Sequence, residues 1–205
     1  MRRAALVLAL AAVPVCAHAQ ITEEPATPFP DPAKFAHGLY ADGEVGAVTF
    51  IGKAGDKLGT GVALGARLGY DLFRFVAIQL HVLGSTHQGT FPNLPQNDQL
   101  MQVYAGTAEL KLTWTFRQLS IFGYFGAGMA RMSSNLLASA GLMGPPAQNP
   151  AAVSLNTPAI GGGGGFDWHT LNRHFSLGLN VGYLQLADVS ASGTLATTVY
   201  LRYTF

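Results

Sequence analysis

The sequence predicts an all-β protein, an eight-stranded antiparallel up-and-down transmembrane β-barrel. Charged residues make up only 11% of the 205 residues and hydrophobic residues 49%, whereas an ordinary soluble domain is about 25% charged. After the N-terminal region, no apolar run reaches the roughly 20 residues that a membrane-spanning helix needs. Apolar and polar residues instead alternate in segments of about ten, as in barrels whose strands face lipid and lumen in turn.

The N-terminal residues 1–19 have the layout of a secretory signal peptide. Arg2 and Arg3 precede an apolar run at 4–15 and small residues at 17–19, so we expect cleavage after Ala19. Cleavage removes two of the twelve basic residues and none of the eleven acidic ones. The mature chain then has ten basic and eleven acidic residues, a net charge of about −1. This balance gives no reason to expect a nucleic-acid partner.

The single cysteine, Cys16, lies inside this predicted signal peptide. The mature chain would therefore have neither disulfides nor thiolate metal sites, and we expect no metal and no cofactor. A lipoprotein alternative would anchor the chain through Cys16. Val15 disfavours it, because a lipid-modification signal has a small residue at this position.

The mature chain begins with a proline-rich segment, 20–42, which we interpret as an extended periplasmic arm. The barrel is predicted over 43–205. Its strands are expected at 43–52, 58–71, 74–88, 101–116, 119–133, 158–169, 174–187 and 194–205.

Alternation is clearest in the fourth segment, where Leu110 and Leu112 alternate with Glu109 and Lys111. A period of two indicates a strand with one apolar face. The second, third and last segments alternate in the same way. The fifth does not sort cleanly, because its aromatic residues fall on both parities.

The connections between strands alternate in length. Those at 71–74, 117–119 and 170–173 are short, and those at 89–100, 134–157 and 188–193 are longer. Bacterial barrels have short periplasmic turns and long extracellular loops, so the chain should end in the periplasm. The short loop at 53–57 is then extracellular as well.

Aromatic residues gather at the strand ends that this orientation places near the periplasm, as an interfacial girdle requires. A soluble β-sandwich is the alternative, but it needs neither a signal peptide nor this ring. The predicted girdle comprises Tyr70, Phe73, Phe75, Trp114, Phe116, Phe122, Phe166, Trp168, Phe175, Tyr203 and Phe205. A thinner outer ring is predicted at Phe50, Tyr104 and Tyr183.

The last segment, 197–205, ends in Phe205 with aromatic or aliphatic residues at alternate positions before it. It resembles the C-terminal strand of bacterial outer-membrane barrels, and residues 43–205 resemble the small eight-stranded group that includes OmpA-like, OmpX-like and OmpW-like barrels. The resemblance implies a Gram-negative outer membrane, contact with its lipid and lipopolysaccharide, and recognition of Tyr203 and Phe205 by the barrel assembly machinery. The motif identifies the class of outer-membrane barrels but does not distinguish among its members.

Both signs of charge fall on predicted lumen-facing positions. We expect Glu44 beside Arg67, and Arg202 beside Glu44, in an ion-pair network, since unpaired charges in a narrow lumen are costly. Structural filling is the preferred interpretation, and a gate or ligand site is the alternative. The predicted network comprises Glu44, Arg67, Glu109, Lys111 and Arg202.

Glycines on inward positions, including Gly61, Gly65 and Gly69, should leave room for larger side chains across a narrow barrel. The run at 161–165 lacks the Lys-Ser/Thr ending of a phosphate-binding loop. We interpret it as packing against neighbours or as a bend or weak point in a strand.

One set of residues could in principle form a catalytic triad: Ser85, His87 and Asp98. Outer-membrane lipid A deacylases, which it resembles imperfectly, carry a His-x-Ser order on a lipid-facing surface. Here the order is reversed, and the parity set by His81 turns both residues inward. We assign no catalytic residues and expect no enzyme. Asp167 and His169 are also paired by spacing, but we place them at the periplasmic rim.

Three functions remain open at this point. The first is a structural barrel or one that acts through its loops, with the apolar loop 134–157 as a surface for a partner. The second is a narrow porin-like channel or conduit for small apolar ligands, of the OmpW-like kind. The third is a lipid-modifying enzyme. The predicted loop contacts are Leu136, Leu137, Leu142 and Met143.

Overall fold

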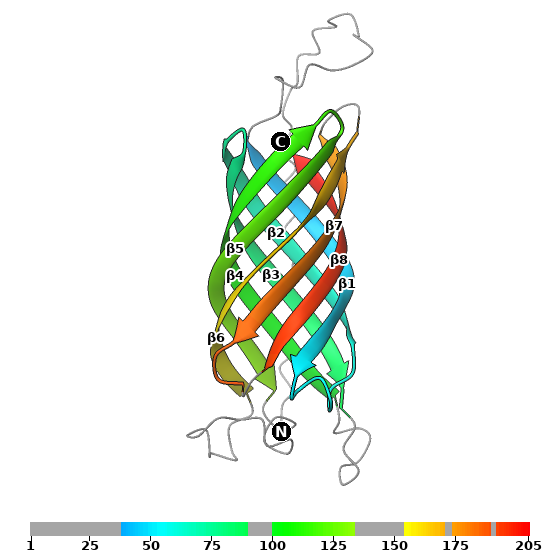
Figure 1. The fold of residues 1–205 in the computed structure, drawn as a ribbon, viewed down its shortest axis with the longest axis vertical. Coiled ribbons are helices and arrows are strands. Elements are labelled where there is room, and N and C mark those ends of the chain that lie inside the picture. The colour runs from blue at the N-terminus through cyan, green and yellow to red at the C-terminus, as the bar shows by residue number, and fades with distance from the viewer. Residues whose placement is uncertain (1–37, 90–99, 134–153, 171–173, 190–191) are drawn as a thin grey trace, which may run out of the picture. The chain divides into compact units, whose positions relative to one another are not determined.

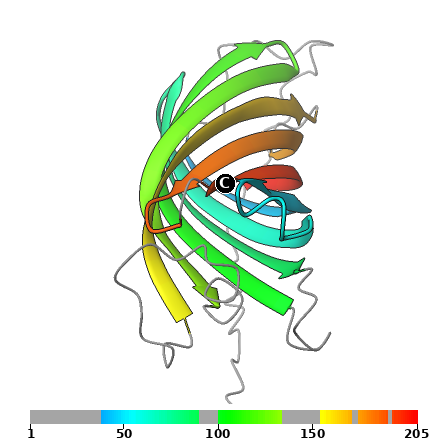
Figure 2. The ribbon, with the colours of Figure 1, turned by 60° about the horizontal axis from the view of Figure 1, so that its bottom comes forward.

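The computed structural model describes residues 38–89, 100–133, 154–170, 174–189 and 192–205. These residues form one closed barrel of eight antiparallel strands, each hydrogen-bonded to the next, with β8 returning to β1. The strands lie side by side and are tilted around the wall (Figures 1 and 2). In order they are β1 (Leu39–Gly52), β2 (Gly61–Phe73), β3 (Val76–Gln88), β4 (Leu100–Phe116), β5 (Leu119–Ser133), β6 (Ser154–His169), β7 (Phe175–Leu186) and β8 (Ser192–Thr204).

All eight predicted strands are present, and β5 has the predicted bounds. The largest differences are two strands that begin earlier than predicted. β1 begins at Leu39 rather than at residue 43, because Leu39 pairs with Tyr70 on β2. Asp42 therefore belongs to the barrel and not to an N-terminal arm. β6 begins at Ser154 rather than at residue 158 and continues through Pro158, a residue that normally weakens a strand.

Two tight turns define one end of the barrel, which we call the turn end and which lies at the top of Figure 1. Arg74 and Phe75 connect β2 to β3, and Arg117 and Gln118 connect β4 to β5. Arg117 has a φ of 55°, because a two-residue hairpin that follows the twist of its strands needs a positive φ. The opposite end, where β1 connects to β2, is the loop end.

The outer wall is apolar. Exposed aliphatic side chains such as Leu64, Leu80 and Ile160 cover its middle, which fits a surface facing lipid. The described part of the chain contains no helix long and apolar enough to cross a membrane. An exposed aromatic girdle surrounds the turn end: Tyr70, Phe73, Phe75, Trp114, Phe116, Phe166, Trp168, Phe175, Tyr203 and Phe205.

Two aromatic predictions were wrong. Phe122, predicted in the girdle, is only 5% exposed, and Phe50, predicted in the outer ring, is 2% exposed. Both lie inside the barrel. Phe122 has the same parity as the buried Ser120, and Phe50 has the same parity as the buried Glu44. Tyr104 and Tyr183 of the predicted outer ring do face outward.

Candidate functional site: the filled lumen

Eight charged or ionisable side chains point into the half of the lumen nearer the turn end and form one unbranched chain of contacts. Acids and bases alternate along it without exception. We call it the charge chain. In order of contact it consists of Glu109, His81, Glu44, Arg67, Asp42, Arg202, Asp167 and Lys111.

Glu44 lies in the first half of the charge chain and is held on three sides. Arg67 Nη2 donates to its Oε2 at 2.5 Å, and the Thr198 hydroxyl donates to the same oxygen at 2.7 Å. His81 Nε2 lies 2.5 Å from Oε1. The carboxylate is fully buried and has partners from three other strands, so it ties β1 to β2, β3 and β8.

His81 lies between two carboxylates. Its Nε2 meets Glu44, and its Nδ1 lies 3.0 Å from Glu109 Oε1. A carboxylate only accepts hydrogen bonds, so with both acids ionised the geometry calls for a donor at each ring nitrogen, as in an imidazolium. With His81 charged, four acids face four bases along the charge chain.

Arg202 joins the two halves of the charge chain. Its guanidinium contacts Asp42 Oδ2 at 2.9 Å and Asp167 Oδ2 at 3.4 Å. The guanidinium carbon also lies 4.2 Å from the centre of the Tyr40 ring, close enough for a cation–π contact. Tyr200 donates from its hydroxyl to the other oxygen of Asp167.

Lys111 ends the charge chain. Its Nζ lies 3.3 Å from Asp167 Oδ2 and 3.9 Å from the centre of the Phe122 ring. The inward turn of Phe122 thus covers a buried ammonium group. Because Asp167 also contacts Arg202 and Tyr200, Lys111 is one of three partners of that carboxylate.

The structure brings some of the predicted network residues together and separates others. Glu44 and Arg67 are in contact. Arg202 pairs with Asp42 and not with Glu44, because Asp42 is its direct cross-strand neighbour and Glu44 faces Tyr200. Glu109 and Lys111 contact other residues and not each other.

Sequence reasoning missed three members of the charge chain. Asp42 was placed in the arm, although its even parity with Glu44 could have extended β1. His81 was used to set the parity of β3, but its position between two inward acids was not considered. Asp167 was placed at the rim, yet it is 1% exposed and one layer deeper than His169, which contacts Ser120.

Inward glycines make room for the largest side chains. Tyr40 packs against Gly69, and Tyr200 against Gly178, so closely that a Cβ at either glycine would collide with the tyrosine ring. This agrees with the predicted packing role of inward glycines. The run at 161–165 lies in the unbroken strand β6, so it does not end a strand.

An apolar cluster fills the loop end of the lumen. Phe50 packs edge-on against the His87 ring at 4.8 Å. The other side chains of the cluster come from β4, β5, β6 and β7 and from the β1–β2 and β7–β8 connections. We call this set the apolar plug: Phe50, Ala54, Leu58, Met101, Val103, Ala130, Met132, Ala159, Leu186 and Val189.

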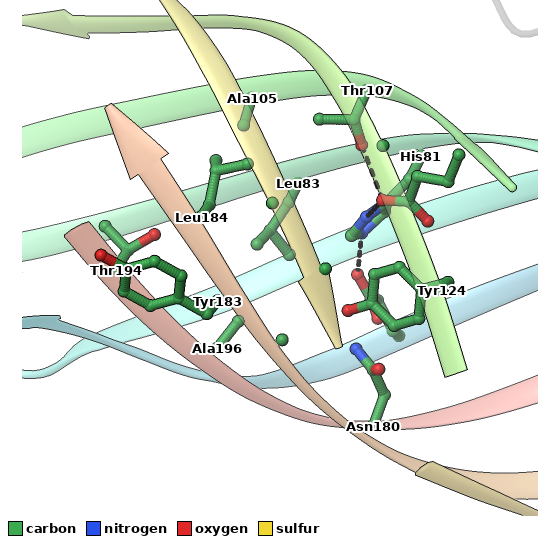
Figure 3. Close-up of a pocket in the computed structure, with 16 residues that line it drawn as sticks. His81, Leu83, Ala105, Thr107, Tyr124, Asn180, Tyr183, Leu184, Thr194 and Ala196 are labelled. Atoms are coloured by element: carbon green, nitrogen blue, oxygen red, sulfur yellow. Dashed lines mark hydrogen bonds and ion pairs between the residues drawn. The ribbon is translucent and has the colours of Figure 1, made fainter. Parts of the chain in front are cut away.

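Between the charge chain and the apolar plug lies a cavity, which we call the mid-lumen cavity. The space open to the centres of water molecules is about 50 Å³, enough for several waters at roughly 10–15 Å³ each. Figure 3 shows Leu83 and Leu184 on one side, and His81, Tyr124 and Asn180 on the other.

Ser85 and His87, members of the predicted catalytic set, point into the barrel and not toward the lipid. Their side chains are 2.9 Å apart, and His87 Nδ1 lies 3.0 Å from the Gly59 carbonyl oxygen. His87 is fully buried. Asp98 lies outside the described residues. Within the described ranges, no group of three or more side chains could hold a metal ion.

The remaining predicted site residues lie at the two ends of the barrel. Tyr203 and Phe205 are exposed at the turn end, with ring centres 5.0 Å apart. The predicted loop contacts Leu136, Leu137, Leu142 and Met143 fall outside the described residues, so a partner at this loop stays a prediction.

No protein-family model and no curated protein matches the chain. Solved structures do. Neisserial surface protein A (NspA) superposes with a TM-score of 0.59 at 11% identity, over 82% of this chain and 97% of that one. The outer membrane protein OprG from Pseudomonas aeruginosa gives 0.52 at 16% identity, over 83% and 97%. Such identities establish the fold alone, and the chain has the fold of the small eight-stranded outer-membrane β-barrels.

Proposed function

We propose that the protein is an integral outer-membrane barrel with a closed lumen, and that it acts structurally or through its extracellular loops. One observation carries this proposal: the lumen is filled in two separate layers. The charge chain occupies the half nearer the turn end, and the apolar plug occupies the loop end. The exposed apolar wall and aromatic girdle support the membrane location.

The two layers block ions for different reasons. In the charge chain, every fixed charge has a buried partner of opposite sign, so a passing ion would have to displace one. In the apolar plug, an ion would lose its hydration shell without gaining a polar partner, which costs several kcal/mol or more. An eight-stranded barrel leaves little space beyond its own side chains.

The refolded protein should therefore show no steady conductance in a planar lipid bilayer. The Phe50→Ala variant, which removes a large side chain from the apolar plug, should also show no conductance, because the charge chain still fills the other half of the lumen. A large porin in the same bilayer is the positive control, and tryptophan emission from Trp114 and Trp168 verifies insertion. Reproducible single-channel steps from the inserted wild-type protein would instead support a channel.

A narrow conduit for small ligands is the second candidate function, and the mid-lumen cavity favours it. The cavity is bordered at both ends by the charge chain and the apolar plug. A ligand could pass only if one of these layers rearranged. An absence of conductance would not test this candidate function, whereas ligand binding in the cavity would support it.

We do not propose an enzymatic function. A lipid-modifying enzyme needs its nucleophile and base beside the lipid. Ser85 and His87 instead lie on inward positions, with the plug residue Phe50 against the imidazole ring. Geometry comes before acid–base chemistry in assigning such a pair.

The C-terminal aromatic residues give a further test of outer-membrane assembly. Phe205→Ala should change the stability of the refolded barrel by no more than about 1 kcal/mol, because the ring is exposed and packs edge-on against Tyr203. If the assembly machinery reads this ring, the amount of assembled barrel in cells should fall several-fold. Phe73→Ala, another exposed girdle position, is the matched control and should assemble normally. Equal amounts of both variants would argue against recognition of Phe205.

A further inference from the structure

The mid-lumen cavity has two chemically different sides. Leu83, Leu184 and small alanines form most of one side, where Tyr183 and Thr194 also lie, and His81, Tyr124 and Asn180 lie on the other (Figure 3). The carboxylates of Glu44 and Glu109 line the polar side. A ligand suited to this cavity is therefore short and amphipathic, with a polar head of limited size.

Asn180 supplies evidence for an incomplete site. It is 1% exposed and lines the cavity, and its Nδ2 donates to Thr198 at 3.4 Å. Its Oδ1 is buried without a hydrogen-bond partner among the described residues. A buried amide oxygen without a donor costs about 1–3 kcal/mol. The cavity therefore favours an occupant that donates a hydrogen bond.

The other polar groups around the cavity identify the kind of donor. The two carboxylates accept only, and the Thr107 hydroxyl already donates to Glu109 at 2.7 Å. The hydroxyls of Tyr124 and Thr194 also line the cavity and can accept as well as donate. A group that only donates suits such surroundings, and an ammonium ion has three donors and no acceptor. An alcohol would bring one donor and no positive charge to face the two carboxylates.

Charge balance adds a condition. His81 supplies the fourth positive charge of the charge chain and borders the cavity. The charged groups facing it are Glu44 on β1, Arg67 on β2 and Glu109 on β4. A second cation beside the imidazolium would give the region an unbalanced positive charge. Loss of the His81 proton would restore the balance when a cation enters.

We propose that the mid-lumen cavity binds a short primary alkylammonium ion. Its ammonium group donates to Asn180 Oδ1, to the Glu44 carboxylate and to His81 Nε2 once that nitrogen has lost its proton, and its alkyl chain packs against Leu83 and Leu184. The ammonium takes over the positive charge of His81, which releases one proton. This inference goes beyond the proposed structural role and does not depend on it.

Propylammonium and 1-propanol are matched probes, since they have the same chain length and differ in the head group. Because both ends of the lumen are filled, the protein is refolded in detergent micelles with the probe present. We expect saturable shifts of the Asn180 side-chain amide signal with propylammonium, and binding of 1-propanol at least about tenfold weaker. Calorimetry in two buffers of different ionisation enthalpy should show about one proton released per ammonium bound.

Two variants locate the site. Ala105→Leu fills the cavity from β4, and Ala108→Leu makes the same change on the lipid-facing side of that strand. Ala105→Leu should weaken propylammonium binding at least about tenfold, and Ala108→Leu should leave it unchanged. Asn180→Leu, which keeps the side-chain size, should also weaken it and serves if Ala105→Leu does not fold.

Three results would overturn the proposal. They are the absence of saturable propylammonium binding, equal binding of propylammonium and 1-propanol, and binding without proton release. Unchanged affinity in both the Ala105→Leu and Asn180→Leu variants would place any bound amine elsewhere. An absence of conductance together with specific amine binding would support both proposals, because the conductance test and the binding test are independent.

Discussion

Replacing Arg202 with leucine should lower the free energy of unfolding by about 3–5 kcal/mol, the cost of breaking a buried ion pair by removing one partner. Arg202 contacts Asp42 and Asp167 at once and stacks on the Tyr40 ring. Its loss leaves two buried carboxylates with fewer partners and divides the charge chain into two parts. Urea titrations of the barrel refolded into lipid vesicles, followed by tryptophan emission, measure the change.

Position along the charge chain should decide the size of the effect. Lys111→Met removes the terminal base, and Asp167 still contacts Arg202 and Tyr200. The variant should therefore cost about 1–2 kcal/mol, clearly less than Arg202→Leu. Arg74→Leu, in the exposed β2–β3 turn, is the matched control and should change stability by no more than about 0.5 kcal/mol. Equal losses for Arg202→Leu and Lys111→Met would show that the contacts do not act as an ordered chain.

For most residues, the sequence predicted whether the side chain points to the lipid or to the lumen, because side chains alternate between the two faces of a strand. Once Leu110 and Leu112 were assigned to the lipid, Glu109 and Lys111 had to face the lumen. The partners of these charges could not be predicted in the same way. Lys111 on β4 meets Asp167 on β6, past the intervening strand β5 and 56 residues along the chain. This contact depends on how far the lysine side chain reaches past a neighbouring strand, which no local pattern encodes.

One error in a strand bound changed the predicted partners of two arginines. Asp42 lies directly opposite both Arg67 and Arg202 in the wall. Starting β1 at residue 43 removed this acid from the lumen and left Glu44 as the nearest predicted partner for both arginines. The parity of Asp42 with Glu44 could have corrected the mistake, but the prolines between residues 25 and 32 led the whole segment to be assigned to an arm.

The aromatic errors have a different cause. Phe50 and Phe122 were assigned from their position near a strand end, although parity with Glu44 and Ser120 places both inside. In β5 no charged residue near Phe122 marks the inner face, so the sequence offered little to set the parity. The inward positions bring an apolar ring to the plug and an aromatic face to Lys111. Both consequences appear only in the folded barrel.

The two inward histidines of β3 should respond differently to the same substitution. His81→Leu leaves Glu44 and Glu109 without a shared cation and gives the charge chain four acids and three bases. We expect a loss of about 3 kcal/mol in the free energy of unfolding. His87→Leu gives up contacts with Ser85 and the Gly59 carbonyl but gains apolar contact beside Phe50, so its effect should stay within about 1 kcal/mol.

Nitrogen NMR of the imidazole rings tests the reason for this difference without any mutation. At neutral pH both ring nitrogens of His81 should carry protons, because each faces a carboxylate oxygen. His87 should be a neutral ring with its proton on Nδ1, which faces the Gly59 carbonyl. A neutral His81 ring would remove the fourth positive charge from the charge chain. The balanced alternation of acids and bases would then no longer explain how the lumen holds four buried carboxylates.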